Sequence, residues 1–262
     1  MHKIISILLT LVIVMTSNHV TANNLTLCTQ NCTLVVLTDN TNKFDYINQQ
    51  RALQRYSPFS TFKIANSLIA LDLGLIRNLQ QQLTIDNKKY PIQKWWPKRW
   101  YATPLTLTQA FEYSAVPIYQ EIANSIGAKK MQRYLNIFQY GNMQITPNID
   151  SFWLNENLKI SAKEQVLFLQ KIHHEKFYLT DKSYTLLKKI MLVEQTGSYK
   201  IYAKTGTGHL NDKSTLGWYV GYVENKKGVY YFAINLSGNK FADVTEKRKI
   251  IAKHYLTEAG II

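Results

Sequence analysis

Hydrophobic and polar positions divide the chain into blocks of different secondary structure. Two strand patterns open it, over 33–38 ("TLVVLT") and 43–48, where β-branched and aromatic residues stand between turn-forming residues. From residue 60 to residue 191 the apolar residues recur at helical spacing. Strand patterns return over 199–236, separated by glycine-containing turns. A last amphipathic helix is predicted over 243–258.

Strands at both ends and helices between them predict an α+β fold. Two distant segments then contribute to one sheet, and the helical block is inserted between them. No internal repeat, low-complexity tract or long Gly/Ser linker divides the chain, and 46% hydrophobic residues are enough for a substantial core. The length suits one large domain or two closely packed subdomains.

The first residues have the organisation of a secretory signal peptide. A basic start is followed by an apolar run over 4–15 and by small residues that end at Ala22. The run is shorter than the roughly 20 residues that a membrane-spanning helix needs. We therefore expect residues 1–22 to be a signal peptide that is removed. The exported domain would cover 23–262 and have no stable membrane span.

The formal net charge of +14 indicates an anionic partner. Such a basic balance suits nucleic acid, an anionic surface or a carboxylate substrate. The Lys and Arg residues are scattered, however, and no arginine-rich run or known binding motif accompanies them. We therefore expect no nucleic-acid partner.

Two residue pairs outside the main motifs have alternative interpretations. Cys28 and Cys32, in "CTQNC", are either two unpaired thiols or a local disulfide, and an oxidising compartment slightly favours the disulfide. The loop between them is short, which makes the geometry demanding. The adjacent His173 and His174 have no metal-binding partner pattern and are interpreted as helix-surface residues. No metal or nucleotide site is expected.

A serine and a lysine lie three residues apart in a helix that is otherwise apolar. Ser60 and Lys63, in "STFKIANSLIALDLGLI", share one face of this helix. In the simplest interpretation Ser60 or Ser57 caps the helix and Lys63 extends to water. The spacing alone is weak evidence for chemistry, because Ser237 and Lys240 repeat it in a turn.

Two further triplets make a catalytic interpretation more specific. "SAV" at 114–116 ends a helical segment and precedes Pro117, so Ser114 is expected on a loop. "KTG" at 204–206 ends a strand pattern, and the glycines of "TGTG" would let another backbone or a ligand come close. Each triplet is ordinary alone, but the three motifs in this order are specific evidence for a catalytic site.

In this combination the sequence resembles the serine penicillin-recognising enzymes, whose active site holds Ser-x-x-Lys, a second serine triplet and Lys-Thr-Gly. Within that group it is similar to the class D β-lactamases, the oxacillinases. The resemblance runs from about residue 33 to the C-terminus. It rests on "PFSTFKIANSLIAL", Ser-x-Val at 114–116, "VPIYQEIA", "YGN" at 140–142, "DSFWLNENLKIS", "KTG" and "EKRKIIAKHYL". It implies a β-lactamase/DD-peptidase-like fold with an antiparallel sheet, and a place in the periplasm of a Gram-negative-type bacterium.

The resemblance gives the buried lysine a chemical role. A serine hydroxyl needs an adjacent base, and burial of Lys63 among apolar side chains lowers its pKa. A neutral amine can react with carbon dioxide, and similarity to class D implies that Lys63 is carried as a carbamate, N6-carboxylysine. Trp153 is expected to hold this carbamate through its indole N–H. Carbon dioxide or bicarbonate is its source, and no cofactor is implied.

The other site residues follow from the same resemblance. Ser60 would form the acyl ester, with the backbone N–H groups of Ser60 and Thr207 as the oxyanion hole. Ser114 would relay a proton to the departing lactam nitrogen. The residues expected to contact the β-lactam are Val116, Lys204, Thr205, Gly206, Thr207 and Arg248. Arg248 has a second interpretation, as a solvated residue in the first turns of a helix.

Two other functions are compatible with these motifs. DD-peptidases share the fold, but Ser-x-Val and Trp153 favour a lactamase. Sensor domains of β-lactam receptors stay acylated, but a removable signal peptide and the lack of a multispanning region argue against a receptor. The stretch 77–105 matches the family poorly, which leaves the rim of the cleft and the substrate range undefined. The sequence carries no signal for an oligomeric state.

Overall fold

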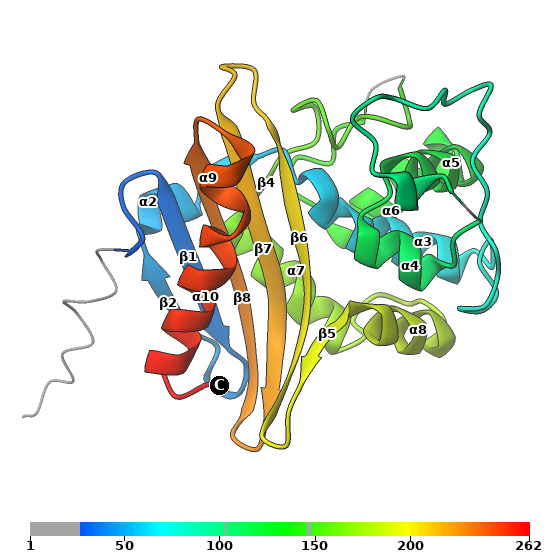
Figure 1. Ribbon diagram of the computed structural model, residues 1–262. Coiled ribbons are helices and arrows are strands. Elements are labelled where there is room, and N and C mark those ends of the chain that lie inside the picture. The colour runs from blue at the N-terminus through cyan, green and yellow to red at the C-terminus, as the bar shows by residue number, and fades with distance from the viewer. Residues whose placement is uncertain (1–26, 103, 146–147) are drawn as a thin grey trace, which may run out of the picture.

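Six strands form one antiparallel sheet in the order β2-β1-β8-β7-β6-β5 (Figure 1). The computed structural model describes residues 27–102, 104–145 and 148–262, so the predicted signal peptide lies outside the described residues. N-terminal β1 pairs along its length with C-terminal β8. The prediction of one antiparallel sheet assembled from both ends of the chain is therefore confirmed. The strands are β1 (Cys32–Thr38), β2 (Lys43–Ile47), β5 (Leu192–Gln195), β6 (Tyr199–His209), β7 (Thr215–Asn225) and β8 (Gly228–Gly238).

Local chemistry explains the long β7–β8 hairpin. The side chain of Asn225 accepts hydrogen bonds from the backbone N–H groups of Lys227 (2.7 Å) and Gly228 (3.1 Å). Gly228 has a φ of 143°, which residues with a Cβ rarely adopt. These features fix the turn, and the register then runs from Asn225–Gly228 to Thr215–Gly238.

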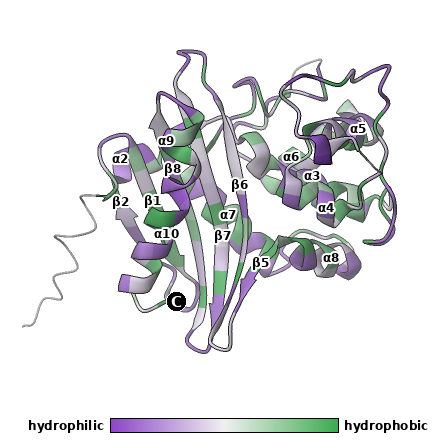
Figure 2. Cartoon of the chain, viewed as in Figure 1, coloured by the Kyte–Doolittle hydropathy of each residue, from purple (hydrophilic) through white to green (hydrophobic). Residues whose placement is uncertain are grey.

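Both faces of the sheet are buried. In β1, Leu34 and Val36 pack in the core beneath the C-terminal helices, while Val35 and Leu37 belong to the core shared with the inserted helices. Alternate residues of a strand point to opposite faces, so burial of both faces makes the strand apolar throughout. Figure 2 shows hydrophobic stretches on β7 between paler ones, and α10 (Lys247–Glu258) as alternately hydrophobic and hydrophilic.

The inserted helices lie between β2 and β5 in the sequence and beside the sheet in space (Figure 1). Capping boxes open two of them, with Thr106 and Gln109 at α4 and Ser161 and Glu164 at α7. The short elements are η1 (Asp39–Thr41), α2 (Gln49–Ala52), β3 (Arg55–Tyr56), η2 (Phe59–Phe62), η3 (Lys98–Trp100) and β4 (Ile160–Ser161). The longer helices are α3 (Lys63–Asp72), α4 (Leu107–Tyr113), α5 (Val116–Ile126), α6 (Ala128–Phe138), α7 (Ala162–His173) and α8 (Asp181–Met191).

Two sequence-based expectations differ from the structure. The single helix predicted over 243–258 is two helices, α9 (Phe241–Thr245) and α10. Val244 of α9 sits directly on the sheet, where a Cβ on Gly217 would lie 2.7 Å from the Val244 side chain. α9 ends at Thr245 and α10 begins at Lys247, with Glu246 between them. The helical pattern also does not continue through 77–105, where Pro91 and Pro97 lack the N–H that a helix needs.

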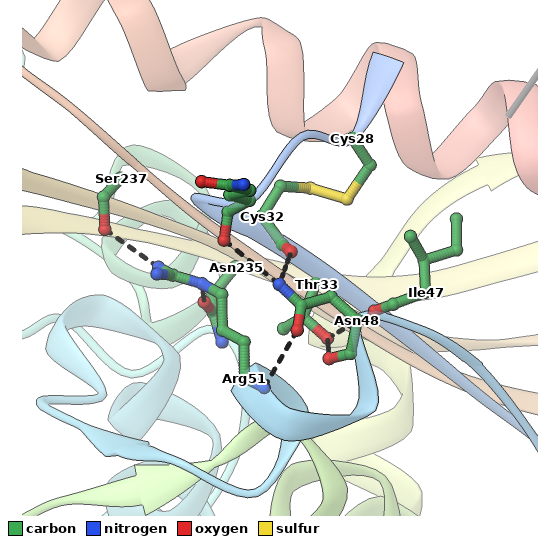
Figure 3. Close-up of a disulfide and its surroundings, with 9 residues drawn as sticks. Cys28, Cys32, Thr33, Ile47, Asn48, Arg51, Asn235 and Ser237 are labelled. Carbon is green, nitrogen blue, oxygen red and sulfur yellow. Dashed lines mark hydrogen bonds between the residues drawn. A yellow bond between two sulfur atoms is a disulfide. The ribbon is translucent and has the colours of Figure 1, made fainter. Parts of the chain in front are cut away.

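The disulfide alternative is the one found for the cysteine pair. Cys28 and Cys32 are bonded, with Cα atoms 5.2 Å apart (Figure 3). Beside them, the Asn48 side chain donates to the carbonyl oxygens of Gln30 (3.0 Å) and Cys32 (3.1 Å). The bridge and these bonds hold the segment that leads into β1.

Across the described ranges, no helix has the length and apolar character needed to cross a membrane.

Candidate active site

A cleft of about 1110 Å³ opens between β6 and the inserted helices. Its lining includes residues from all three sequence motifs and from the C-terminal helix. Most of the predicted site residues thus converge from distant parts of the chain. Those that line the cleft include Ser60, Ser114, Val116, Thr205, Thr207 and Arg248.

Ser60 lies in η2, the turn that leads into α3, and Lys63 is the first residue of α3. The Lys63 Nζ donates a hydrogen bond of 2.9 Å to the Ser60 Oγ, and Lys63 is fully buried. Neither serine caps the helix, because Ser57 Oγ donates to the Trp153 carbonyl at 3.0 Å and Ser60 accepts from Lys63. The simplest interpretation, a capping serine and a lysine that extends to water, is therefore wrong, and the expected burial of Lys63 is confirmed.

Burial determines the protonation of Lys63. It holds the pKa of the Lys63 amine well below its usual value, and the charge of Lys204 acts in the same direction. No carboxylate in the described part of the chain forms a salt bridge with Lys63, and its Nζ lies 5.0 Å from the centre of the Tyr119 ring. The amine is therefore disposed to be neutral beside the Ser60 hydroxyl.

Trp153 is fully buried against the same segment. Its ring stacks on Phe62 with 5.4 Å between centroids, and its carbonyl accepts from the Phe59 N–H at 3.1 Å. The indole Nε1 is buried and has no hydrogen-bond partner among the described residues. A buried N–H without an acceptor costs about 1–3 kcal/mol. Carbamylation of Lys63 would supply oxygens that can accept this bond.

Ser114 ends α4 in the left-handed conformation, with a φ of 60°. This agrees with its predicted position on a loop. The Lys204 Nζ donates to the Ser114 Oγ at 3.0 Å. Burial lowers the pKa of Lys204 to about 7, and the charges of Arg248 and Lys249 contribute. Lys204 can therefore gain or lose a proton near neutral pH while it lies beside the Ser114 hydroxyl.

Glycines on β6 allow η2, the turn that carries Ser60, to pack against the strand. A Cβ on Gly206 would lie 2.9 Å from the Pro58 oxygen and 3.1 Å from the Ser60 nitrogen. A Cβ on Gly208 would lie 2.2 Å from the Phe59 ring. The expected close approach of another backbone is confirmed at Gly206, whereas Gly208 makes room for the Phe59 ring. Phe59 itself has a φ of 47°, an unfavourable conformation for a residue with a Cβ.

Arg248 reaches the cleft from α10. It is buried, and its Nη1 donates to the Gly206 carbonyl (2.6 Å) and to the Thr207 hydroxyl. Its pKa is lowered to about 10 by burial, so the guanidinium remains charged at neutral pH. The interpretation of Arg248 as a solvated helix residue is therefore wrong. The Arg248 guanidinium is instead hydrogen-bonded to β6, the strand that carries the KTG motif.

Sequence reasoning missed an aromatic rim on the cleft. Trp95, Trp96 and Trp100 line it, with 5.6 Å between the ring centroids of Trp95 and Trp100. Trp95 is 65% exposed, which is high for so large an apolar side chain. The signal in the sequence was "WWPKRW", where three tryptophans cluster around Pro97.

Comparison with known proteins gives a consistent family. Residues 30–256 match the model of the penicillin binding protein transpeptidase domain. The chain is 40% identical to beta-lactamase OXA-48 of Klebsiella pneumoniae over 82% of its length and 78% of that protein. It is 33% identical to the methicillin resistance mecR1 protein of Staphylococcus aureus, over 84% of this chain and 36% of that protein.

A solved structure agrees with the sequence matches. The fold superposes on FUS-1 (OXA-85), a class D beta-lactamase from Fusobacterium nucleatum subsp. polymorphum, with a TM-score of 0.82 and 34% identity. The match covers 88% of this chain and 93% of that one.

Proposed function

This chain belongs to the class D β-lactamases, hydrolases with the penicillin-binding transpeptidase fold, and from that premise we propose that it opens the β-lactam ring of penicillins through an acyl-enzyme on Ser60. The observation that carries the mechanism is the contact of 2.9 Å between the buried Lys63 amine and the Ser60 hydroxyl. It supports a base next to the nucleophile, which serine needs at neutral pH.

Lys63 acts as a carbamate in this mechanism. Its neutral amine attacks carbon dioxide, and the product is an anionic carbamate and a released proton. The low pKa of the amine supports this step, because an ammonium group has no lone pair for attack. The unpartnered Nε1 of Trp153 supports a hydrogen bond to the carbamate. Carbon dioxide or bicarbonate is the only co-reactant.

Acylation begins when the carbamate takes the Ser60 proton and the Ser60 oxygen attacks the lactam carbonyl. The backbone N–H groups of Ser60 and Thr207 stabilise the oxyanion. The C–N bond of the ring then breaks, and Ser114 gives a proton to the nitrogen. The bond of 3.0 Å from Lys204 to Ser114 supports replacement of that proton from Lys204.

Deacylation uses the same base. The proton that the carbamate took from Ser60 first passes through solvent to Lys204, which lost one in the relay, and the carbamate is anionic again. The carbamate then takes a proton from water, and the resulting hydroxide attacks the Ser60 ester. Ser60 leaves with the proton from the carbamate, so the enzyme and the hydrolysed drug are released. An anionic base at Lys63 thus separates a hydrolase from a protein that stays acylated.

Arg248 and Thr205 bind the carboxylate of the substrate. Both line the cleft, and Arg248 is charged and hydrogen-bonded to the strand that carries Thr205. A guanidinium presents paired donors that suit a carboxylate. Val116, also on the cleft, forms an apolar wall for the bound drug. Lys204 favours this anion through its charge, although its amine bonds to Ser114.

Export places this activity where it protects a cell. We infer that residues 1–22 direct the chain to the periplasm, where hydrolysis of penicillin confers resistance. The test is the mass of the protein recovered from the periplasm of an expressing Gram-negative host, with the minimum inhibitory concentration measured beside a Ser60→Ala strain. The expected mass starts at Asn23, and the expected resistance disappears in the Ser60→Ala strain.

Time-resolved intact mass spectrometry with a penicillin tests the hydrolase against a protein that is only acylated. In bicarbonate buffer the wild type should gain the mass of the drug and then return to its free mass as penicilloate accumulates. Lys63→Ala and Trp153→Phe should remain acylated for far longer. Trp153→Phe is the sharper variant, because it keeps the ring stacked on Phe62 and removes the N–H.

Two controls separate the alternatives. Removal of dissolved carbon dioxide should slow deacylation of the wild type, and added bicarbonate should restore it. A wild type that stays acylated in bicarbonate would be a sensor or penicillin-binding protein, and the hydrolase proposal would be rejected. Faster release of a D-Ala-D-Ala peptide than of penicilloate would indicate a DD-peptidase.

A further inference from the structure

A cluster of Asp39, His173 and His174 lies away from the cleft. Each residue offers one potential ligand atom, and these three atoms lie within 4.8 Å of one another. Strand β7 measures the separation from the cleft. Glu224, which contacts His173, lies six residues along this strand from Trp218. The Trp218 Nε1 donates to the Ser57 carbonyl beside the cleft. At about 3.3 Å per residue, the cluster is roughly 20 Å from that end of the strand.

Glu224 fixes the tautomer of His173. The His173 Nε2 lies 3.2 Å from the Glu224 Oε1, and a carboxylate only accepts hydrogen bonds, so Nε2 must donate. In the neutral ring the lone pair is then on Nδ1. This atom is buried and has no hydrogen-bond partner within the described part of the chain. A ring nitrogen held to a carboxylate, with the other nitrogen free, is the arrangement of metal-binding histidines.

Asp39 is also oriented by its neighbours. Its Oδ1 accepts from Gln170 Nε2 (3.1 Å), Tyr231 OH (3.2 Å) and His174 Nε2 (2.7 Å). The Gln170 and Tyr231 bonds fix the carboxylate without occupying Oδ2. Lys188 balances the charge of Glu224 at 2.5 Å, so Glu224 serves as an outer partner and Asp39 as the anionic ligand.

We propose that Asp39, His173 and His174 bind a divalent transition-metal ion of the zinc type, with water completing the coordination. Two imidazoles and a carboxylate are ligands that Zn²⁺ prefers. The ion replaces the proton that His174 shares with Asp39, and that proton goes to solvent. Ligand atoms on a tetrahedral zinc ion are roughly 3.3 Å apart, so small side-chain rotations suffice. His174 is 40% exposed, which gives the ion a path from solvent.

Binding would join the β1–β2 connection to the end of α7. Asp39 belongs to η1, between β1 and β2, whereas the histidines end the helix that packs on the sheet. The two histidines were interpreted from the sequence as surface residues without a metal partner. Their partner is 135 residues from His174 in the sequence, so no local spacing could reveal it.

Equilibrium dialysis against zinc chloride, followed by metal analysis, tests this site in the full mature protein. We expect one zinc ion per chain in the wild type after prior chelator treatment. At a 100-fold excess of zinc over its Kd, Tm should rise by roughly 5–10 °C. His174→Ala and Asp39→Asn should lose both effects, whereas His254→Gln, a change at another histidine, should keep them.

The outcomes are distinct from those of the acyl-enzyme experiment. Circular dichroism shows whether the variants fold, and penicillin turnover in chelator should equal that of the zinc-free wild type in each variant. Absence of stoichiometric zinc in the wild type, or equal zinc in folded His174→Ala and Asp39→Asn, overturns the site. Neither result bears on Ser60 acylation.

Discussion

Lys204 donates a hydrogen bond of 3.0 Å to Ser114, which lies 90 residues earlier in the chain. Ser114 lines the cleft, and Lys204 is buried behind it with only 5% of its surface exposed. Burial brings the pKa of this lysine to about 7, near the pH at which the enzyme would work. A group whose pKa lies near the working pH can both give up and take back a proton, which suits it to resupply a proton to Ser114.

Ser114→Ala should slow β-lactam opening by about 10²- to 10⁴-fold in kcat, because the nitrogen loses its proton donor. The change deletes only a hydroxyl at the end of α4, so the fold should be kept. Stopped-flow acylation rates with a penicillin give the measurement. Ser198→Ala, at an exposed turn, is the control and should retain the wild-type rate. A normal acylation rate in Ser114→Ala would exclude the relay.

Lys204 should also make stability depend on pH. Its folded pKa of about 7 lies below the ordinary value of 10.5, so the unfolded chain binds more protons between these limits. The free energy of unfolding therefore rises with pH across pH 7 to 10.5, by about 1.4 kcal/mol per unit at most from this group. Below pH 7 both states are protonated, and the penalty is constant.

Urea unfolding of wild type and Lys204→Met at several pH values checks this sign. Lys204→Met should be the more stable protein at pH 7, and the difference should shrink as the pH rises towards 10.5. Lys200→Met, at an exposed position on the same strand, removes the same charge as a control. A difference that stays constant with pH would contradict the low pKa of Lys204.

Gly206→Ala should disrupt the contact between β6 and η2, the turn that carries Ser60. Its Cβ would press on the Pro58 oxygen and the Ser60 nitrogen, both parts of backbone that cannot rotate away. A shift of about 1 Å at Ser60 can cost 10²-fold in rate, and overpacking costs about 1–3 kcal/mol of stability. Kinetics and urea unfolding measure the two effects.

Gly197→Ala is the matched control for that variant. A Cβ at Gly197 meets nothing within 4 Å, so the substitution should leave kcat/KM unchanged. It should slightly raise the free energy of unfolding, because Ala has less conformational freedom in the unfolded chain. If Gly206→Ala and Gly197→Ala had the same kcat/KM and the same free energy of unfolding, the close approach at Gly206 would not matter for activity or stability.

Burial of Lys63 could be predicted because its neighbours in the sequence are its neighbours in space. Apolar residues surround it in one helix, and Ser60 lies one turn away. Arg248 shows the opposite case. Its own helix is rich in charge and looks solvated, and only the strand 42 residues away shows that it is buried. A contact between distant segments leaves no periodic signal in either one.

Strand β5 was missed for a related reason. Helical patterns were predicted to residue 191 and strands only from residue 199, but Leu192–Gln195 form β5, and Leu192 pairs with Tyr202 of β6. So short a strand depends on pairing with its neighbour more than on local propensity. The rim around Trp95 was also not predicted, because its three tryptophans pack edge-to-face or tilted against one another rather than following a backbone repeat.

Removal of the disulfide should lower stability and leave catalysis intact. Cys28 and Cys32 close a short loop in front of β1 (Figure 3), and the chain-entropy model assigns such a loop about 2 kcal/mol. Cys28→Ser/Cys32→Ser should therefore lower Tm by roughly 4–8 °C. Neither cysteine lines the cleft, so penicillin turnover at 25 °C should match the wild type.

The hydrogen bonds of Asn48 provide a comparison for the same segment. The Asn48 amide donates to the carbonyl oxygens of Gln30 and Cys32. Its Oδ1 accepts a hydrogen bond from the Arg51 N–H. Asn48→Gly removes these bonds while allowing the positive φ of 56°. If the bridge and the side chain restrain one segment, combining the two changes should cost less than the sum of their separate effects. Full additivity in urea unfolding would show that the disulfide and Asn48 act on the segment independently.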